Sequence, residues 1–183
     1  MFARQLKNCE IRSWQVSDLD SLVEHANNRK IWLNLRDRFP YPYTRSAGRD
    51  WIRHVRKMAP ATSFAIAVDG AAVGGIGFVP QSDVERVSAE IGYWLGEAFW
   101  GRGIATQALI AVTDYAFEKH ELTRLFALPF ARNLASCRVL EKAGYVLEAR
   151  LRRNAIKDGV VTDSMLYAFI AEGPDPPPAE HPG

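Results

Sequence analysis

Cysteine is scarce in this chain, and long apolar runs are absent. Only Cys9 and Cys137 occur among the 183 residues, with neither a CxxC pair nor metal-ligand spacing. Two reduced thiols are therefore favoured over a disulfide, which the spacing alone leaves open. No stretch approaches the roughly eighteen apolar residues of a membrane span, and the charged start MFARQLKNCEIR differs from a signal peptide. We expect a cytoplasmic protein with no bound metal and no membrane partner.

Neither sign of charge dominates. The 23 Lys and Arg residues nearly balance the 21 Asp and Glu residues, for a net charge of +2. This small excess is far from that of a dedicated nucleic-acid-binding protein. The cluster Arg150, Arg152 and Arg153 hints at nucleic-acid binding, but it lacks interleaved aromatic residues. We therefore expect no nucleic-acid partner.

Length and composition suit one globular domain. Apolar residues make up 48% of the chain and charged residues 24%, both ordinary values. A chain of 183 residues can bury one sizeable core but is short for two. Only the segment 173–183, GPDPPPAEHPG, is compositionally biased, and its prolines oppose a helix or a central strand. We expect one domain over residues 1–172 and a proline-rich tail over 173–183.

Hydrophobic periodicity predicts a few helices, then a meander of strands, then a strand–helix–strand–helix unit and a final hairpin. Ser17 is the expected N-cap of the first helix, with Asp18 and Asp20 in its first turn, where the dipole favours negative charge. Asp69-Gly70 is the two-residue turn that a hairpin prefers. In chain order, the expected elements are a strand at 11–14, helices from Ser17, over 28–35 and over 44–58, strands at 64–68, 71–79 and 88–95, a helix over 103–119, a strand at 125–128, a helix over 133–143, and strands at 145–153 and 160–170.

Two further helix starts carry recognisable caps. Thr44 is the expected N-cap of the third helix, and Asn133 that of the last one, which Gly144 ends. Cys137 shares its helical phase with apolar neighbours and is expected in the core. The strand–helix–strand unit predicts one parallel pair in an otherwise antiparallel sheet. The fold class is therefore α+β, with mixed helices and strands.

The segment from Tyr93 to Thr106 predicts an anion site. A strand leads through a glycine-bearing loop directly into an amphipathic helix, which presents unpaired N–H groups and the positive end of the helix dipole. Such an arrangement binds phosphate. Gly101 and Gly103 permit close approach of the backbone, and Arg102 adds a positive charge. The Lys-Ser or Lys-Thr of a Walker loop is missing, as is the third glycine of a dinucleotide fold.

Three blocks of the sequence resemble one family. The segment 100–106 resembles the acetyl-CoA-binding motif Gln/Arg-x-x-Gly-x-Gly/Ala of GNAT superfamily N-acetyltransferases, with Trp100 where Gln or Arg is usual. The block 133–145 resembles the Asn-x-x-Ser…Lys-x-Gly-Phe/Tyr motif of the ribosomal-protein-alanine N-acetyltransferase-like branch, and the segments 27–28 and 38–44 also look like that branch. The resemblance spans roughly residues 10 to 170.

The resemblance implies a GNAT-type fold, a largely antiparallel twisted sheet with a splayed central parallel pair, flanked by helices. It implies acetyl-CoA as co-substrate and direct transfer of the acetyl group to a primary amine in a ternary complex, with a protein N-terminal α-amine as the first choice of acceptor. A homodimer is also open, because many members of the family form one. The implied cofactor-binding residues are Trp94, Leu95, Trp100, Gly101, Arg102, Gly103, Ile104, Ala105, Thr106, Asn133 and Ser136.

Glu90 is the candidate general base. It shares a strand face with Trp94 if the alternation holds, and its strand leads into the cofactor loop. The alternative is an edge carboxylate paired with a surface arginine such as Arg86. Glu97, in the turn, and Glu141, on a solvated helix face, are weaker candidates.

Ser136 is the candidate partner of the departing sulfur. In other branches a tyrosine of the second block has this role, and its position falls here on Leu140. The resemblance therefore assigns to Ser136 a hydrogen bond or a proton for the leaving thiolate. The alternative is local, because a serine in the first turn can satisfy a backbone group near the Asn133 cap.

The acceptor pocket is implied by the same resemblance to lie between the N-terminal helices and the loop 38–44. Trp32, Phe39, Tyr41 and Tyr43 are its candidate aromatic wall, and the alternative is that these rings only pack the helices onto the sheet. Besides a protein N-terminus, a polyamine, an aminoglycoside or another small amine stays open as acceptor. A non-catalytic module that binds acyl-CoA would carry the same motifs.

Overall fold

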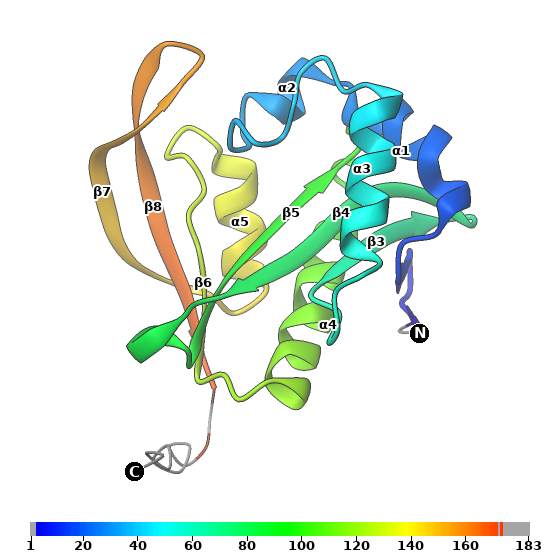
Figure 1. The fold of residues 1–183 in the computed structure, drawn as a ribbon. Coiled ribbons are helices and arrows are strands. Elements are labelled where there is room, and N and C mark those ends of the chain that lie inside the picture. The colour runs from blue at the N-terminus through cyan, green and yellow to red at the C-terminus, as the bar shows by residue number, and fades with distance from the viewer. Residues whose placement is uncertain (1–2, 172, 174–183) are drawn as a thin grey trace.

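A computed structural model describes residues 3–171 and 173. At its centre lies an eight-stranded sheet of spatial order β1-β2-β3-β4-β5-β6-β8-β7 (Figure 1). Neighbouring strands are antiparallel except β5 and β6, which run parallel, so the expected fold class is confirmed. In chain order the strands are β1 (Ala3–Gln5), β2 (Glu10–Arg12), β3 (Ser63–Val68), β4 (Ala71–Pro80), β5 (Ser88–Leu95), β6 (Arg124–Ala127), β7 (Val146–Lys157) and β8 (Val160–Ile170).

The helices begin where the sequence places caps, with one exception. The Thr44 side chain accepts from the N–H of Ala47 at 3.2 Å, and the Asn133 side chain accepts from Ser136 at 3.2 Å. Gly144 has a φ of +88° directly after the last helix, as a helix-ending glycine does. The helices are α1 (Leu19–Ala26), α2 (Arg29–Trp32), α3 (Arg45–Val55), α4 (Ile104–Lys119) and α5 (Leu134–Lys142), with short 3₁₀ turns η1 (Val16–Asp18), η2 (Asp83–Glu85) and η3 (Glu97–Phe99).

The exception is the first helix, where the predicted cap Ser17 is wrong. Ser17 lies inside η1, whose N-cap is Gln15. Asp18 is not a solvated residue of a first turn but is buried, and both of its carboxylate oxygens accept from Arg12, at 2.7 and 2.8 Å. A buried guanidinium requires a counter-charge, and this need overrides the local preference for a serine cap.

Several other boundaries differ from the predicted ones, and one expected segment falls almost wholly outside the described residues. The helix expected over 28–35 is the single turn α2. β1 was not predicted, because its three residues are all exposed and carry no apolar alternation. The tail expected over 173–183 lies outside the described residues except for Gly173, and the single domain over 1–172 stays a prediction.

The sheet separates two apolar clusters. One contains residues of α4 and α5 and the side chain of Phe64, and the other contains residues of α1 and α3 and Ala65. Phe64 and Ala65 are adjacent in β3, so α4 and α5 cover one face and α1 and α3 the opposite face (Figure 1). Cys137 belongs to the first cluster, as predicted, and both it and Cys9 are free and buried.

The parallel pair parts halfway along β5. Cα pairing between β5 and β6 covers only Ser88–Glu90 and Arg124–Phe126, whereas β5 stays paired with β4 as far as Leu95. Figure 1 shows the two strands diverging from this point. The splayed parallel pair implied by the family resemblance is therefore confirmed, and we call the space beyond Glu90 the gap.

The buried Arg12–Asp18 pair yields a prediction of stability. Asp18→Asn keeps the shape and removes the charge, which leaves the nearly buried guanidinium with only the carboxylate of Glu10, 3.8 Å from its Nε, as counter-charge. We therefore expect the free energy of unfolding to fall by about 3 kcal/mol, the lower end of the loss for a buried ion pair. Urea denaturation followed by circular dichroism measures this. The matched control is Asp50→Asn, whose ion pair with Arg53 is exposed and should change stability by less than about 1 kcal/mol. Equal losses in the two variants would contradict the assigned importance of the buried pair.

Candidate active site

The loop between β5 and α4 forms a backbone anion site. Gly101 and Gly103 have φ of +76° and +75°, and a Cβ at either position would meet nothing within 4 Å. No side chain caps α4 at Gly103, and Gln107 donates the first N–H paired inside the helix, to Gly103 O at 3.1 Å. The N–H groups at the start of this 16-residue helix are thus left for a ligand. Their position fits an anion such as a pyrophosphate.

Neighbouring side chains hold this loop in place. The indole Nε1 of Trp100 donates to the carbonyl of Leu95 at 2.7 Å, which ties the loop to the end of β5. The guanidinium carbon of Arg102 lies 5.2 Å from the ring centroid of Phe99, within cation–π range. Asn8 donates to the carbonyl of Arg102 at 3.1 Å. The rigid ends of the loop fix the direction in which its N–H groups point.

The end of β5 directs a backbone donor into the gap. Gly96 donates its N–H to Val73 of β4 at 2.8 Å. Because the backbone groups of successive strand residues point to opposite edges, the N–H of Leu95 points away from β4, toward the gap. Beyond Glu90 no β6 residue pairs with β5 there.

Ser136 meets a residue that the motifs did not indicate. Its hydroxyl lies 2.8 Å from the hydroxyl of Tyr93, which also donates to the Ser136 carbonyl at 3.3 Å. Burial raises the pKa of Tyr93 far above its usual range, so the phenol keeps its proton. Leu140, where other branches have a tyrosine, is fully buried in the core. Tyr93 supplies a phenolic hydroxyl from β5 instead. Its side chain points to the face of β5 opposite that of Glu90, as the strand alternation predicts. The alternation alone does not show that α5 packs on that face, so the sequence offered little indication that Tyr93 meets Ser136.

Glu90 lies on the opposite face of β5 from Tyr93 and on the same face as Trp94, as the alternation predicts. Its carboxylate accepts from Arg36 at 2.5 Å, and its side chain is 23% exposed. The suggested partner Arg86 was wrong, because Arg86 donates to the carbonyl of Asp83 in its own turn. Glu90 and Ser136 therefore lie on either side of the gap and are not hydrogen-bonded to each other in the described part of the chain.

The two weaker carboxylates have other partners. Glu97 accepts from Asn28 at 2.8 Å and is paired with Lys30, and these two groups lower its pKa. Glu141 accepts from the hydroxyl of Tyr167 at 2.8 Å. These contacts tie neighbouring segments of the chain together, so we assign both carboxylates a structural role.

The expected aromatic wall divides into two pairs. Phe39 lies between Tyr43 and Trp94, with ring centroids at 5.0 and 5.7 Å. Tyr43 is buried in the cluster under α1 and α3, where burial raises its pKa to about 12. The second pair, Trp32 and Tyr41, lies closer to solvent, with centroids 5.7 Å apart. Tyr43 thus packs the helix onto the sheet, while Phe39 lies beside Trp94 on the Glu90 face.

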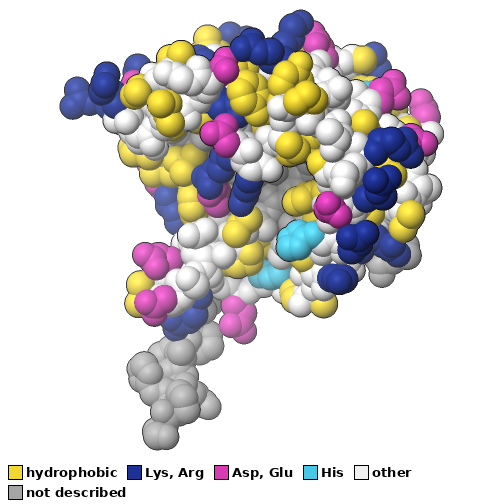
Figure 2. All heavy atoms as spheres, turned by 45° about the horizontal axis from the view of Figure 1, so that its top comes forward, with side chains coloured by type: hydrophobic (Ala, Val, Ile, Leu, Met, Phe, Trp, Pro, Cys, Tyr) yellow, Lys and Arg dark blue, Asp and Glu magenta, His cyan; other side chains and the backbone are white. Residues whose placement is uncertain are grey.

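One side chain of the β7 arginine cluster, that of Arg150, is paired with a neighbouring carboxylate. Asp163 accepts from the side chain of Arg150 at 2.7 Å and from the backbone of Arg153 at 2.8 Å. On the face drawn in Figure 2, basic side chains are interspersed with acidic and apolar ones. Neither observation favours a nucleic-acid surface.

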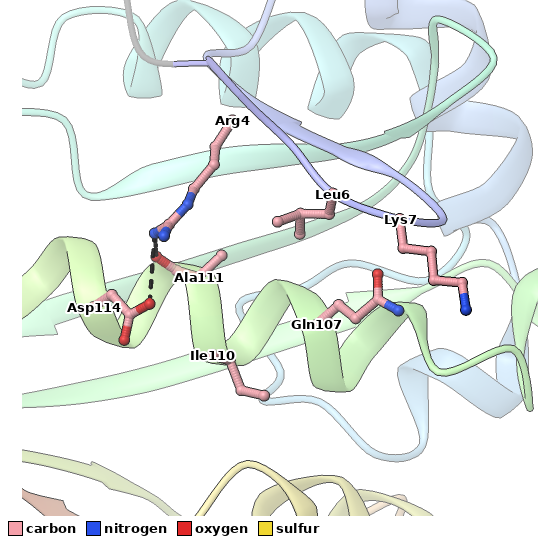
Figure 3. Close-up of a pocket in the computed structure, with 7 residues that line it drawn as sticks. All are labelled: Arg4, Leu6, Lys7, Gln107, Ile110, Ala111 and Asp114. Carbon is pink, nitrogen blue, oxygen red and sulfur yellow. Dashed lines mark hydrogen bonds and ion pairs between the residues drawn. The ribbon is translucent and has the colours of Figure 1, made fainter.

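A hollow of about 250 Å³ lies away from these groups, between the β1–β2 hairpin and α4 (Figure 3). Arg4 crosses its edge, donating to the carbonyl of Ala111 at 3.3 Å and pairing with Asp114 at 3.5 Å. The residues that line it are Arg4, Leu6, Lys7, Gln107, Ile110, Ala111 and Asp114. Neither Glu90 nor Ser136 is among them, so the hollow is no part of the candidate site.

Comparison with known proteins identifies the family. The sequence model of the acetyltransferase (GNAT) domain matches residues 8–146. The chain belongs to the GNAT acetyltransferase family. It is an acetyltransferase of the GNAT type, as the motif at 100–106 predicts.

Among the individual relatives are ribosomal-protein acetyltransferases. The probable N-acetyltransferase YjcK of Bacillus subtilis is 45% identical over 45% of this chain and 46% of its own length. The ribosomal-protein-serine acetyltransferase of Escherichia coli is 32% identical over 61% of this chain and 62% of its own length. The chain thus spans about half to two thirds of these relatives. A solved structure, RimJ of Mycobacterium smegmatis in complex with CoA-disulfide, is 26% identical with a TM-score of 0.77, covering 90% of this chain and 82% of that one. The resemblance to ribosomal-protein acetyltransferases is confirmed.

The described residues hold neither a group of metal-ligating side chains nor a helix fit to cross a membrane. In residues 3–171 and 173, no three His, Cys, Asp or Glu side chains are grouped as metal ligands. No helix in the same part of the chain is long and apolar enough to cross a membrane.

The anion site yields a prediction of binding. Gly103→Ala places a Cβ at a left-handed position, which costs about 1–2 kcal/mol. We expect the free loop to relax away from this conformation, so that CoA binding has to restore it. We expect the Kd for CoA, measured by calorimetry, to rise about tenfold. The control is Gly70→Ala, which carries the same strain (φ +81°) in the β3–β4 turn and should leave the Kd unchanged. Similar Kd values in the two variants would exclude the loop as the anion site.

Proposed function

We propose that this enzyme transfers the acetyl group of acetyl-CoA to the α-amine of a protein N-terminus, by direct attack in a ternary complex. The observation that carries the proposal is the position of the gap. The uncapped start of α4 adjoins its open end, the Ser136–Tyr93 hydroxyl pair lies on one face of β5, and Glu90 lies on the other. Each group that acyl transfer to an amine needs therefore borders one space.

The proposed cofactor contacts follow from the backbone. The N–H groups over 101–106 would hold the pyrophosphate, and the N–H of Leu95 would donate to the oxygen that becomes negative during transfer. Asn133 caps α5 at the same side of the gap and would contact the pantetheine arm. Bound acetyl-CoA supplies the activated acetyl group and the thiolate leaving group.

Glu90 is the proposed acceptor of the amine proton, through a water molecule. An α-amine with a pKa near 7.7–8.0 needs only about 1–1.4 kcal/mol to become neutral at pH 7, whereas a lysine needs about 4–5 kcal/mol. A carboxylate that is only 23% exposed, at the rim of the gap, suffices for the first task and is poorly suited to the second. The name of the E. coli relative, a ribosomal-protein-serine acetyltransferase, agrees with an N-terminal acceptor.

Ser136 and Tyr93 are proposed to stabilise the departing sulfur together. When Tyr93 donates its single proton to Oγ of Ser136 instead of to the Ser136 carbonyl, the serine proton becomes free to point at the sulfur. Because a thiol has a pKa of about 8.5 and the pKa of Tyr93 is raised, the phenol stays protonated and the pair acts by hydrogen bonding rather than by proton transfer. Cytoplasmic location and a homodimer stay predictions.

An activity assay tests the acceptor and the base. Purified protein is incubated with acetyl-CoA and N-terminal peptides, lysine peptides, spermidine or an aminoglycoside, and released CoA is measured with a thiol reagent. We expect turnover of N-terminal peptides, and a decrease of roughly 10²-fold in kcat/KM for Glu90→Gln. Silence on every amine, with CoA binding intact, would favour a non-catalytic acyl-CoA-binding module.

A double-mutant cycle tests the hydroxyl pair. We expect Ser136→Ala and Tyr93→Phe each to lower kcat by about 2–10-fold, the worth of one hydrogen bond. The double variant should lose about as much as either single one, because the two hydroxyls act as a unit. Tyr145→Phe is the control, since it removes a buried hydroxyl bonded to Thr113 at 2.7 Å. A fully additive cycle would refute the coupling.

A further inference from the structure

One segment crosses the Glu90 side of the gap and is tied down at several points. Residues 28–39 include α2, which lies at the top of Figure 1, and we call this segment the cover. Beside the cofactor loop, Asn28 and Lys30 hold Glu97. In the middle, the carbonyl of Leu33 accepts from Arg132, in the loop before α5, at 2.7 Å.

The cover is also bound to the β7–β8 hairpin, once near each of its ends. Asp37 accepts from Lys157 at 2.7 Å, and Arg29 donates to Asp158 at 2.6 Å. The Lys157 side chain is 1% exposed, and its ammonium lies 3.7 Å from the ring centroid of Trp32. The contacts with Glu97, with Arg132 and with the β7–β8 hairpin together hold the cover in place over β5.

Arg36 is the residue of the cover that reaches Glu90. Its guanidinium lies 2.5 Å from the carboxylate and so takes the position that an acceptor amine must approach. Both side chains are accessible, 53% for Arg36 and 23% for Glu90, so the pair is weakened by solvent and opens readily. An entering amine, with the water molecule that relays its proton to Glu90, therefore takes the place of the guanidinium.

We infer that Arg36 selects the acceptor: the amine displaces it from Glu90, and the freed guanidinium binds a carboxylate just behind the amine, so that peptides with acidic residues after the N-terminal residue are preferred over polycations. The inference rests on the proposed function and adds the class of substrate.

The charges of the cover support this selection. It carries Arg29, Lys30, Arg36 and Arg38 against a single acid, Asp37. That acid is already paired with the buried Lys157, so the cover holds no unpaired acid for the freed guanidinium. A polyamine would leave Arg36 among cations, whereas an Asp or Glu of the acceptor matches the planar fork of the guanidinium in two hydrogen bonds. Discrimination thus includes a repulsive element against the wrong acceptor.

The test compares three peptides that differ only after the first residue, Ser-Glu-Glu, Ser-Ala-Ala and Ser-Lys-Lys, each followed by the same neutral sequence. For the unaltered enzyme we expect kcat/KM to be about tenfold higher for the acidic than for the basic peptide, mainly through KM. Arg36→Gln should bring the three values within about twofold of one another. Arg36→Lys keeps the charge without the fork and should restore part of the preference.

Arg53→Gln is the matched control, since it removes an exposed arginine paired with Asp50 on α3 and should keep the preference. Thermal unfolding verifies that the Arg36 variants are folded. Activity without a preference for the acidic peptide, or a preference that survives in Arg36→Gln, would overturn the inference and leave the proposed function standing. Silence of the unaltered enzyme on all three peptides would overturn the proposed function and the inference with it.

Discussion

After Glu90, β5 keeps β4 as a neighbour and loses β6, and the candidate site depends on this parting of two parallel strands. A strand without a partner leaves backbone groups unpaired, and these usually cost stability when they are buried. Here one of them, the N–H of Leu95, borders the gap. The carbonyl of Leu95 is satisfied by the indole of Trp100, so the same residue that anchors the cofactor loop also completes the end of the strand.

Close packing against β4 fixes the position of Trp94, which lies on the same face of β5 as Glu90. A Cβ at Gly75 would lie 2.7 Å from Nε1 of Trp94, so only a glycine lets this ring lie against the strand. Phe39 packs on the other edge of Trp94 and brings the end of the cover to the sheet. Under α1, the Arg12–Asp18 pair holds the start of the helical layer. The rim of the gap is therefore built on rigid elements, although the groups that face it come from distant parts of the chain.

The sequence correctly predicted the features that depend on residues close together in the chain. The strand 88–95 and the caps at Thr44 and Asn133 were predicted correctly, because alternation and capping involve neighbours in the chain. Long-range partners could not be read in this way. Arg36 and Glu90 are separated by 54 positions, and Tyr93 and Ser136 by 43, so their contacts depend on how helices and strands pack. The motifs indicated Glu90 and Ser136, but their companions Arg36 and Tyr93 required the structure.

Glu90 and Tyr93, the partner of Ser136 in α5, point to opposite faces of β5, and this bears on the order of events. With the roles proposed above, the thioester lies along the α5 side of the strand, and the amine arrives from the side of the cover. With the two reactants on opposite faces of β5, either can bind first, and neither has to leave before the other binds. Such binding is sequential, because no acetylated enzyme has to form before the second reactant binds. Double-reciprocal plots of initial rate would therefore show intersecting rather than parallel lines.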